Sequence, residues 1–274
     1  MRRFTAFARS LSLSGRIGLT LVLFWLFAAV AGPWLAPYSV GAFVDYEVFS
    51  GASRRFWLGS DYLGRDVLSR LLWGARYTVF LAFGAALAAS MTGTALALFA
   101  AIKGGWVDEL LARAMDTLIS IPSKIFALVL VAAFGSSLGL LLLICAITYI
   151  PGNFRIARAL AMNLVALDFV QVARTRGEGA FHIALREVLP NMIHPWLADL
   201  GLRFVFIVLL LSGLSFLGLG VQPPYADLGS LVRENISGLT EGALAIVLPA
   251  IAIATLTVGA NLVIDALKPV EDRK

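Results

Sequence analysis

Residues Thr78–Ile102 read TVFLAFGAALAASMTGTALALFAAI, a run of 25 residues without a charged side chain. A helix needs about 20 apolar residues to cross the hydrocarbon core of a bilayer, so this run is long enough to span it with some tilt. The whole chain has the same character, because 59% of its 274 residues are hydrophobic and only 14% are charged. Soluble domains usually carry about 25% charged residues. The sequence therefore predicts an all-α integral membrane protein.

Six apolar runs of about bilayer length predict six transmembrane helices. The third is the least regular, because Pro122 and Lys124 interrupt its start. An even number of spans places both termini on the same side of the membrane. The six runs are Ile17–Ala36, Thr78–Ile102, Leu118–Phe134, Leu138–Phe154, Met192–Leu219 and Ala243–Leu267.

The basic residues predict which side that is. Fifteen of the 22 Lys and Arg residues lie in the N-terminus, the segments 103–124 and 155–191, and the C-terminal tail. Positive residues are retained in the cytoplasm, so we expect both termini and the 155–191 segment to be cytoplasmic. The outer segment 37–77 carries five arginines, but long outer segments are translocated largely regardless of charge. The net charge of +5 is thus a sign of membrane topology rather than of nucleic-acid binding.

The N-terminus has the pattern of a secretory signal peptide: four arginines, an apolar core and an Ala29-Val30-Ala31 sequence. We interpret it as a retained membrane anchor. The expected organisation is a cytoplasmic N-terminus (1–16), a first span (17–36), a periplasmic segment with an amphipathic helix (37–77), a five-span core (78–267) that includes the 155–191 loop, and a cytoplasmic tail (268–274).

Catalytic and metal-binding motifs are missing from the sequence. No Gly-Lys dipeptide occurs, which excludes a phosphate loop of the GxxxxGK type. The single cysteine, Cys145, excludes a disulfide within the chain, and His182 and His194 lack the paired spacing of a metal site. We therefore expect a structural role for each histidine, no bound cofactor or metal, and no enzymatic activity. Energy for any active transport must come from another chain or from an ion gradient.

The 155–191 segment, RIARALAMNLVALDFVQVARTRGEGAFHIALREVLPN, is polar and basic although apolar runs flank it. Its spacing is helix-like on both sides of the Gly177-Glu178-Gly179 break. Gln171-Val172-Ala173, Gly177 and Leu189-Pro190 resemble the EAA loop of ABC-importer permeases, although Gln171, Val172 and Glu187 depart from the usual pattern. The resemblance implies a short helix, a glycine turn and a second helix that fit a groove on an ATPase. Amphipathic inner loops are also common in membrane proteins of other kinds.

The residues of this loop suit that role. Gly177 and Gly179 permit positive φ and a sharp bend, and Ala173 lets a partner surface approach closely. Arginines can pair with carboxylates across an interface, and Pro190 ends the second helix. The residues expected at the ATPase are Gln171, Val172, Ala173, Arg174, Arg176, Gly177, Glu178, Gly179, Arg186, Leu189 and Pro190.

Two longer motifs narrow the resemblance. WLGSDYLGRDVLSRLLWGAR (57–76) and LSFLGLGVQPP (214–224) resemble the C-type permease subunit of the dipeptide/oligopeptide/nickel ABC importers. Asn261-Leu262 and Asp265 resemble the start of the same family's C-terminal pattern, which stops early here at Lys268-Pro269, and Leu228 replaces the family's tryptophan. The family-motif residues before the second span are Gly59, Asp61, Gly64, Arg65, Asp66 and Arg70.

Residue spacing alone identifies two groups of polar residues, one in the first of these motifs and one in the fifth predicted span. Asp61, Arg65 and Ser69 recur every four residues, which predicts an amphipathic helix at the outer membrane surface that either packs on the bundle or contacts a partner. Asp199 and Arg203 lie four apart within the fifth predicted span. Charges at membrane depth are costly, so this pair lines a translocation path, neutralises itself within the helix, or lies near enough to the inner interface to reach water.

The resemblance implies a type I ABC importer permease fold in a bacterial inner membrane. It implies ATP-driven, alternating-access import of peptides or a related small solute, such as nickel or a metal chelate. The expected partners are a second permease subunit in a heterodimer, two ATPase subunits carrying ATP and Mg, a periplasmic substrate-binding protein, and lipid. An ion-gradient-driven secondary transporter and a structural or assembly subunit remain alternatives; the first favours inverted repeats, which we do not find.

Overall fold

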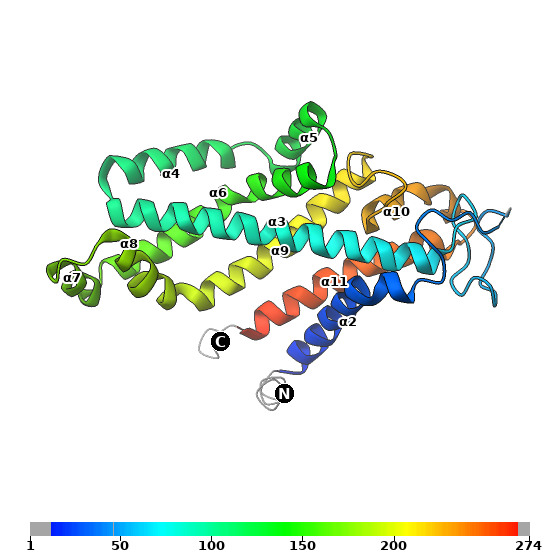
Figure 1. The fold of residues 1–274 in the computed structure, drawn as a ribbon, viewed down its shortest axis with the longest axis horizontal. Helices are drawn as coiled ribbons and strands as arrows, with labels where there is room; N and C mark the ends of the chain where they lie inside the picture. Colours follow the sequence, from blue (N-terminus) through cyan, green and yellow to red (C-terminus); the bar gives the residue numbers. More distant parts are fainter. Residues whose placement is uncertain (1–11, 46, 268–274) are drawn as a thin grey trace.

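The computed structural model describes residues 12–45 and 47–267, and within these ranges the regular structure is helical, without an extended strand. Predictions for residues 1–11 and for the 268–274 tail lie outside the described residues. The helices form an elongated bundle, with α7 and α8 at one end and the 37–66 segment and α10 (Leu228–Glu234) at the other (Figure 1). The all-α prediction is confirmed.

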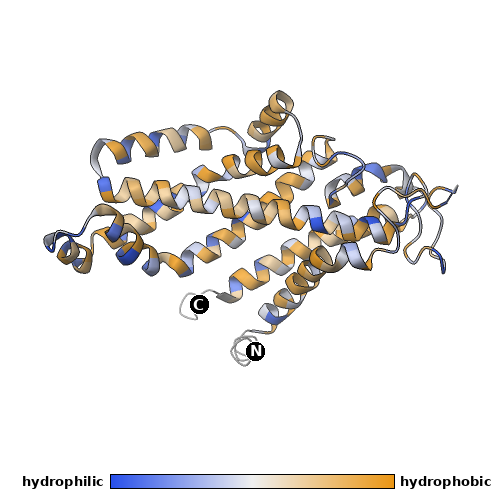
Figure 2. Ribbon diagram, in the orientation of Figure 1, coloured by the Kyte–Doolittle hydropathy of each residue, from blue (hydrophilic) through white to orange (hydrophobic). Residues whose placement is uncertain are grey.

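Five helical stretches of the described chain are long and apolar enough to cross a membrane. Figure 2 shows hydrophobic residues along these helices and hydrophilic residues gathered toward the ends of the bundle. The stretches are α2 (Leu13–Leu35), α3 (Val67–Lys103), α6 (Leu138–Val165), the continuous stretch Ala180–Phe216 that ends in α9 (Ile193–Phe216), and α11 (Leu244–Leu267).

The predicted third span, Leu118–Phe134, is not one straight helix. Instead α4 (Gly105–Ile119) and α5 (Ser123–Phe134) meet at an angle of 85°. Pro122 explains the break, because its ring has no N–H to donate and disfavours helical geometry in the residue before it. The pair counts as a sixth span only if the bent helices cross together, so the structure has five or six candidate spans.

The predicted surface helix around Asp61–Ser69 is wrong. Asp61 and Arg65 lie in a turn, and α3 begins only at Val67, with the Asp66 side chain accepting a hydrogen bond from the Ser69 N–H as its N-cap. From there α3 runs for 37 residues through the centre of the bundle. The turn therefore leads directly into the longest helix instead of lying separately on the membrane surface.

Small residues allow the long helices to approach closely. The buried face of α3 is rich in alanine, as at Ala82, Ala85 and Ala89, and packs on α6 and α9. Between α2 and α11, a Cβ at Gly18 would lie 2.6 Å from Leu262 Cβ, so only glycine fits there. Packing through small residues is the usual way helices associate in lipid, where apolar surface alone gives little driving force.

Helices α2 and α11 run antiparallel, since Gly18 lies against Leu262 and the indole N–H of Trp25 donates to the hydroxyl of Thr255 at 2.9 Å. The start of α2 and the end of α11 consequently lie close together in Figure 1. This arrangement agrees with an even number of membrane crossings.

Candidate functional site

A hairpin at one end of the bundle contains all the residues expected at the ATPase. It consists of α7 (Asp168–Thr175), α8 (Ala180–His182), a π-helical turn (Ile183–Val188) and a 3-10 turn (Leu189–Met192). We call residues 168–192 the hairpin. Residues 155–165 of the predicted loop belong instead to α6, which continues through Pro151 to Val165.

The turn of the hairpin is a Schellman motif. The N–H of Gly177 donates to the carbonyl of Arg174 at 3.0 Å, and the N–H of Glu178 donates to that of Ala173 at 3.2 Å. Such an ending needs a residue with positive φ, and Gly177 has φ of 79°. The predicted glycine bend is therefore present at Gly177, whereas Gly179 has φ of −72° and needs no glycine freedom.

The inner face of the hairpin is anchored to the bundle. Val170, Ala173, Ile183 and Val188 are buried in one apolar cluster with Phe154 of α6. Ala173 was expected to admit a partner surface, and this expectation is wrong, because its methyl group is already covered by the same chain. Gln171 is also partly used within the chain, since its side-chain amide donates to the Val165 carbonyl at 3.0 Å.

The outer face combines basic and apolar side chains. Arg174, Arg176 and Arg186 are exposed on it. Three apolar side chains of the hairpin, Val172, Leu185 and Phe181, are also exposed, the last with 79% of its surface accessible. Exposed aromatic and arginine side chains are the types most enriched at protein interfaces.

Pro190 does not end the second helix, contrary to the prediction. The chain stays helical from Ala180 to Phe216, and Pro190 lies in the first turn of the 3-10 segment, where its missing N–H costs little. The second half of the hairpin is thus continuous with α9, which is part of a candidate span.

The family-motif residues gather at the opposite end of the bundle. Asp61, Arg65, Arg70 and Glu234 form what we call the four-charge cluster. Asp61 Oδ2 lies 2.7 Å from Arg65 Nε and 2.8 Å from Arg70 Nη1, and Glu234 Oε2 lies 2.9 Å from Arg65 Nη2 and 2.6 Å from Arg70 Nη1. The cluster joins the turn, α3 and α10. This geometry supports the packing alternative for the motif.

Two glycines of the motif shape the same turn, and Asp66 ends it as the N-cap of α3. Gly64 has φ of 70°, and a Cβ there would lie 2.2 Å from the carbonyl oxygen of Asp45. Gly59 has φ of 82°, and a Cβ there would collide with the Ser50 carbonyl at 2.4 Å.

Within the four-charge cluster, burial raises the pKa of Glu234 to about 7, although Arg65 opposes the shift.

Asp199 and Arg203 lie in a buried network between α3, α6 and α9. Arg203 Nη2 lies 2.9 Å from Asp199 Oδ1, and both side chains are buried. The amide of Asn153 donates to Asp199 Oδ2 at 2.7 Å, and the hydroxyl of Thr94 donates to the Asn153 carbonyl oxygen at 3.1 Å. The network joins α3, α6 and α9, which favours the neutralised-pair alternative; contact with a translocation path stays a prediction.

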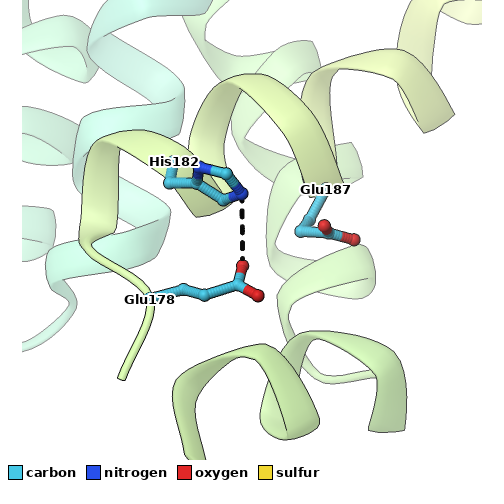
Figure 3. Close-up of side chains that lie close together, drawn as sticks. All are labelled: Glu178, His182 and Glu187. Atoms are coloured by element: carbon cyan, nitrogen blue, oxygen red, sulfur yellow. Dashed lines mark ion pairs between the residues drawn. The ribbon is translucent and has the colours of Figure 1, made fainter. Parts of the chain in front are cut away.

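Sequence reasoning missed two long-range partners and one local group. Asn153 and Glu234 complete the two buried clusters, but each lies tens of residues from its partners, and no local pattern identifies it. The third case is His182, which lies beside Glu178 and Glu187 in the hairpin (Figure 3). The prediction considered only pairs of histidines, so it overlooked a mixed histidine and glutamate set.

Long apolar helices, an exposed hairpin at one end and a buried charge cluster at the other define a helical multi-pass membrane protein. The family model "Binding-protein-dependent transport system inner membrane component" matches residues 89–274. The chain belongs to this family. It is therefore a multi-pass inner-membrane transport subunit, and the predicted ABC permease membership is confirmed.

Individual relatives cover almost the whole chain. The glutathione transport system permease protein GsiD of Pectobacterium atrosepticum is 32% identical over 92% of this chain and 84% of its own length. The di/tripeptide transport system permease protein DppC of Pseudomonas aeruginosa is 32% identical over 94% and 87%. The dipeptide transport system permease protein DppC of Haemophilus influenzae is 29% identical over 94% and 90%. These names describe permeases, in agreement with a non-catalytic subunit.

Proposed function

We propose that this chain is the permease subunit of an ATP-driven importer that moves peptides from the periplasm to the cytoplasm. The observation that carries the proposal is the exposed arginine and apolar face of the hairpin, in a chain that belongs to a binding-protein-dependent transport family. The peptide class rests on the relatives, which are named for glutathione, dipeptides and di/tripeptides. None of these three names supports nickel or a metal chelate, and no observation favours an ion-gradient-driven transporter.

The hairpin would transmit the energy of ATP hydrolysis. In this proposal two ATPase subunits, which bind ATP and Mg, dock under the hairpins of this chain and of a second permease subunit, and a substrate-binding protein delivers peptide from outside. Shifting a permease from 1% to 99% of one of its two conformations requires a partner that binds this conformation about 5.5 kcal/mol more tightly than the other. The continuity of the hairpin with α9 supports such transmission, because movement of one displaces the other.

Charge reversal tests the docking surface. Arg174→Glu with Arg176→Glu should reduce recovery of the ATPase subunit with the membrane-purified complex, because both arginines are exposed and can pair with carboxylates. Phe181→Ser should act in the same direction by removing an exposed aromatic anchor. The measurement is ATPase co-purification, followed by peptide-dependent ATP hydrolysis in proteoliposomes.

The matched control is Arg54→Glu, which reverses an exposed arginine at the opposite end of the bundle. It should leave ATPase recovery unchanged. If the hairpin variants insert at normal levels and recover as much ATPase as the Arg54 variant, the docking surface is assigned wrongly.

A further inference from the structure

We infer that Glu178, His182 and Glu187 form a binding site for a divalent transition-metal ion such as Zn²⁺ on the hairpin. One ligand atom from each residue lies within 4.8 Å of the others, and Figure 3 shows Glu178 facing the His182 ring with Glu187 beside them. Neither family membership nor the proposed ATPase contact supplies this inference, and it does not depend on either of them.

The local backbone explains why the three side chains meet. His182 and Glu187 are five residues apart, which in an α-helix places them about 140° apart around the axis. Here the intervening turn, Ile183–Val188, is a π-helix, whose hydrogen bonds join residues five apart and bring residue i+5 over residue i. Glu178 follows Gly177 at the Schellman turn, four residues before His182, so its carboxylate reaches the imidazole from the other side.

The distances are close to those of a coordination sphere. Zinc binds histidine nitrogen and carboxylate oxygen at about 2.0–2.2 Å, so two ligands at a tetrahedral angle lie about 3.3–3.5 Å apart. His182 Nε2 and Glu178 Oε2 are 3.4 Å apart. A Glu187 carboxylate oxygen lies within 4.8 Å of a ligand atom of each of the other two, so a small movement would complete a three-ligand site whose fourth position is left for water.

An independent observation concerns Glu178. Its Oε2 atom is shielded from solvent and accepts no hydrogen bond from any described residue, although His182 Nε2 lies 3.4 Å away as an ion-pair partner and the side chain as a whole is 25% exposed. This contact is longer than a hydrogen bond, and a polar atom that is shielded from water favours a closer cation or donor. The atom faces the His182 ring, where a cation would satisfy both groups.

The ligand set indicates the class of metal. An imidazole with two carboxylates suits zinc and related first-row ions, whereas calcium needs six to eight oxygen ligands and magnesium prefers octahedral oxygen sites. A bound ion would connect the residue after α7 to the turn before α9. It would thereby fix the bend of the hairpin.

The test uses the full-length protein, purified in detergent and titrated with Co²⁺ as a spectroscopic substitute for Zn²⁺. We expect one tightly bound equivalent with the visible absorption of a low-coordinate nitrogen and oxygen site, displaced by Zn²⁺. His182→Ala and Glu187→Gln should each weaken binding at least about tenfold, because even residues behind the ligands contribute 10- to 100-fold. His182 has a side chain 43% exposed, so its substitution should not unfold the protein.

The matched control is His194→Ala, which removes the other histidine of the chain and should leave the affinity unchanged. A second readout is hydrogen exchange, in which Zn²⁺ should slow amide exchange over residues 174–188 in the wild type but not in His182→Ala. The inference is overturned if the wild type binds no stoichiometric Co²⁺, or if His194→Ala weakens binding as much as His182→Ala does.

Discussion

Asp199 holds together a buried network of polar side chains. Its carboxylate is the acidic partner of buried Arg203 and also accepts the hydrogen bond of Asn153. A charge buried without its partner costs several kcal/mol, while a buried pair replaced as a whole by apolar residues costs little. The network therefore makes the effect of a substitution depend on whether one or both charges are removed.

Asp199→Asn should destabilise the folded protein by on the order of 3 kcal/mol, because Arg203 stays buried without a carboxylate. The double variant Asp199→Leu with Arg203→Met should recover most of that loss. Thermal unfolding of purified protein in detergent measures both. Peptide transport by the double variant separates the two alternatives for this pair: retained transport indicates packing only, and lost transport in a stable protein indicates a residue of the path.

Glu234 gives the four-charge cluster a pH dependence. Its folded-state pKa of about 7 lies above the ordinary glutamate value of about 4.3, so between these values the folded protein holds a proton that the unfolded chain releases. The Glu234 contribution to stability is therefore present at low pH and falls as pH rises through 7. The melting temperature of the wild type minus that of Glu234→Gln should decrease from pH 5 to pH 8, and a constant difference would contradict this pKa.

At the scale of elements, the turn before α3 depends on backbone geometry that only glycine provides. Gly64→Ala places a Cβ against the Asp45 carbonyl and strains a left-handed residue, so we expect a loss of at least about 1–2 kcal/mol in thermal unfolding. Gly51→Ala is the matched control, because a Cβ there meets open space in the same segment. Equal stability of the two variants would show that the turn does not hold the start of α3.

At the scale of the whole molecule, the positive-inside pattern predicts that the hairpin and the start of α2 face the cytoplasm. Single cysteines can report this in a Cys145→Ala background, since Cys145 is the only native cysteine. A membrane-impermeant maleimide should label Ser53→Cys on intact spheroplasts, but label Ser14→Cys and Thr175→Cys only after permeabilisation. Labelling of Thr175→Cys before permeabilisation would reverse the proposed orientation.

Predictions from the sequence were correct where they depend on residues close together in the chain, and failed where distant residues decide the structure. Five of the six predicted spans, the bend at Gly177 and the four-residue spacing that pairs Asp61 with Arg65 depend on composition or near neighbours, and the structure contains them. The surface helix before α3 and the end of a helix at Pro190 were wrong. In both cases local propensity was overridden, first by buried ion pairs to α3 and α10, then by continuous helical packing into α9.

The sequence by itself determined the membrane class and the family, because long uncharged runs and contiguous motifs need no knowledge of distant contacts. Only the tertiary structure decided what those motifs contact. It placed Glu234 on two arginines more than 160 residues away, Asn153 on Asp199, and Glu187 beside His182 through one π-helical turn. Each of these contacts depends on how helices pack or wind in three dimensions, and side-chain spacing along the chain does not contain that information.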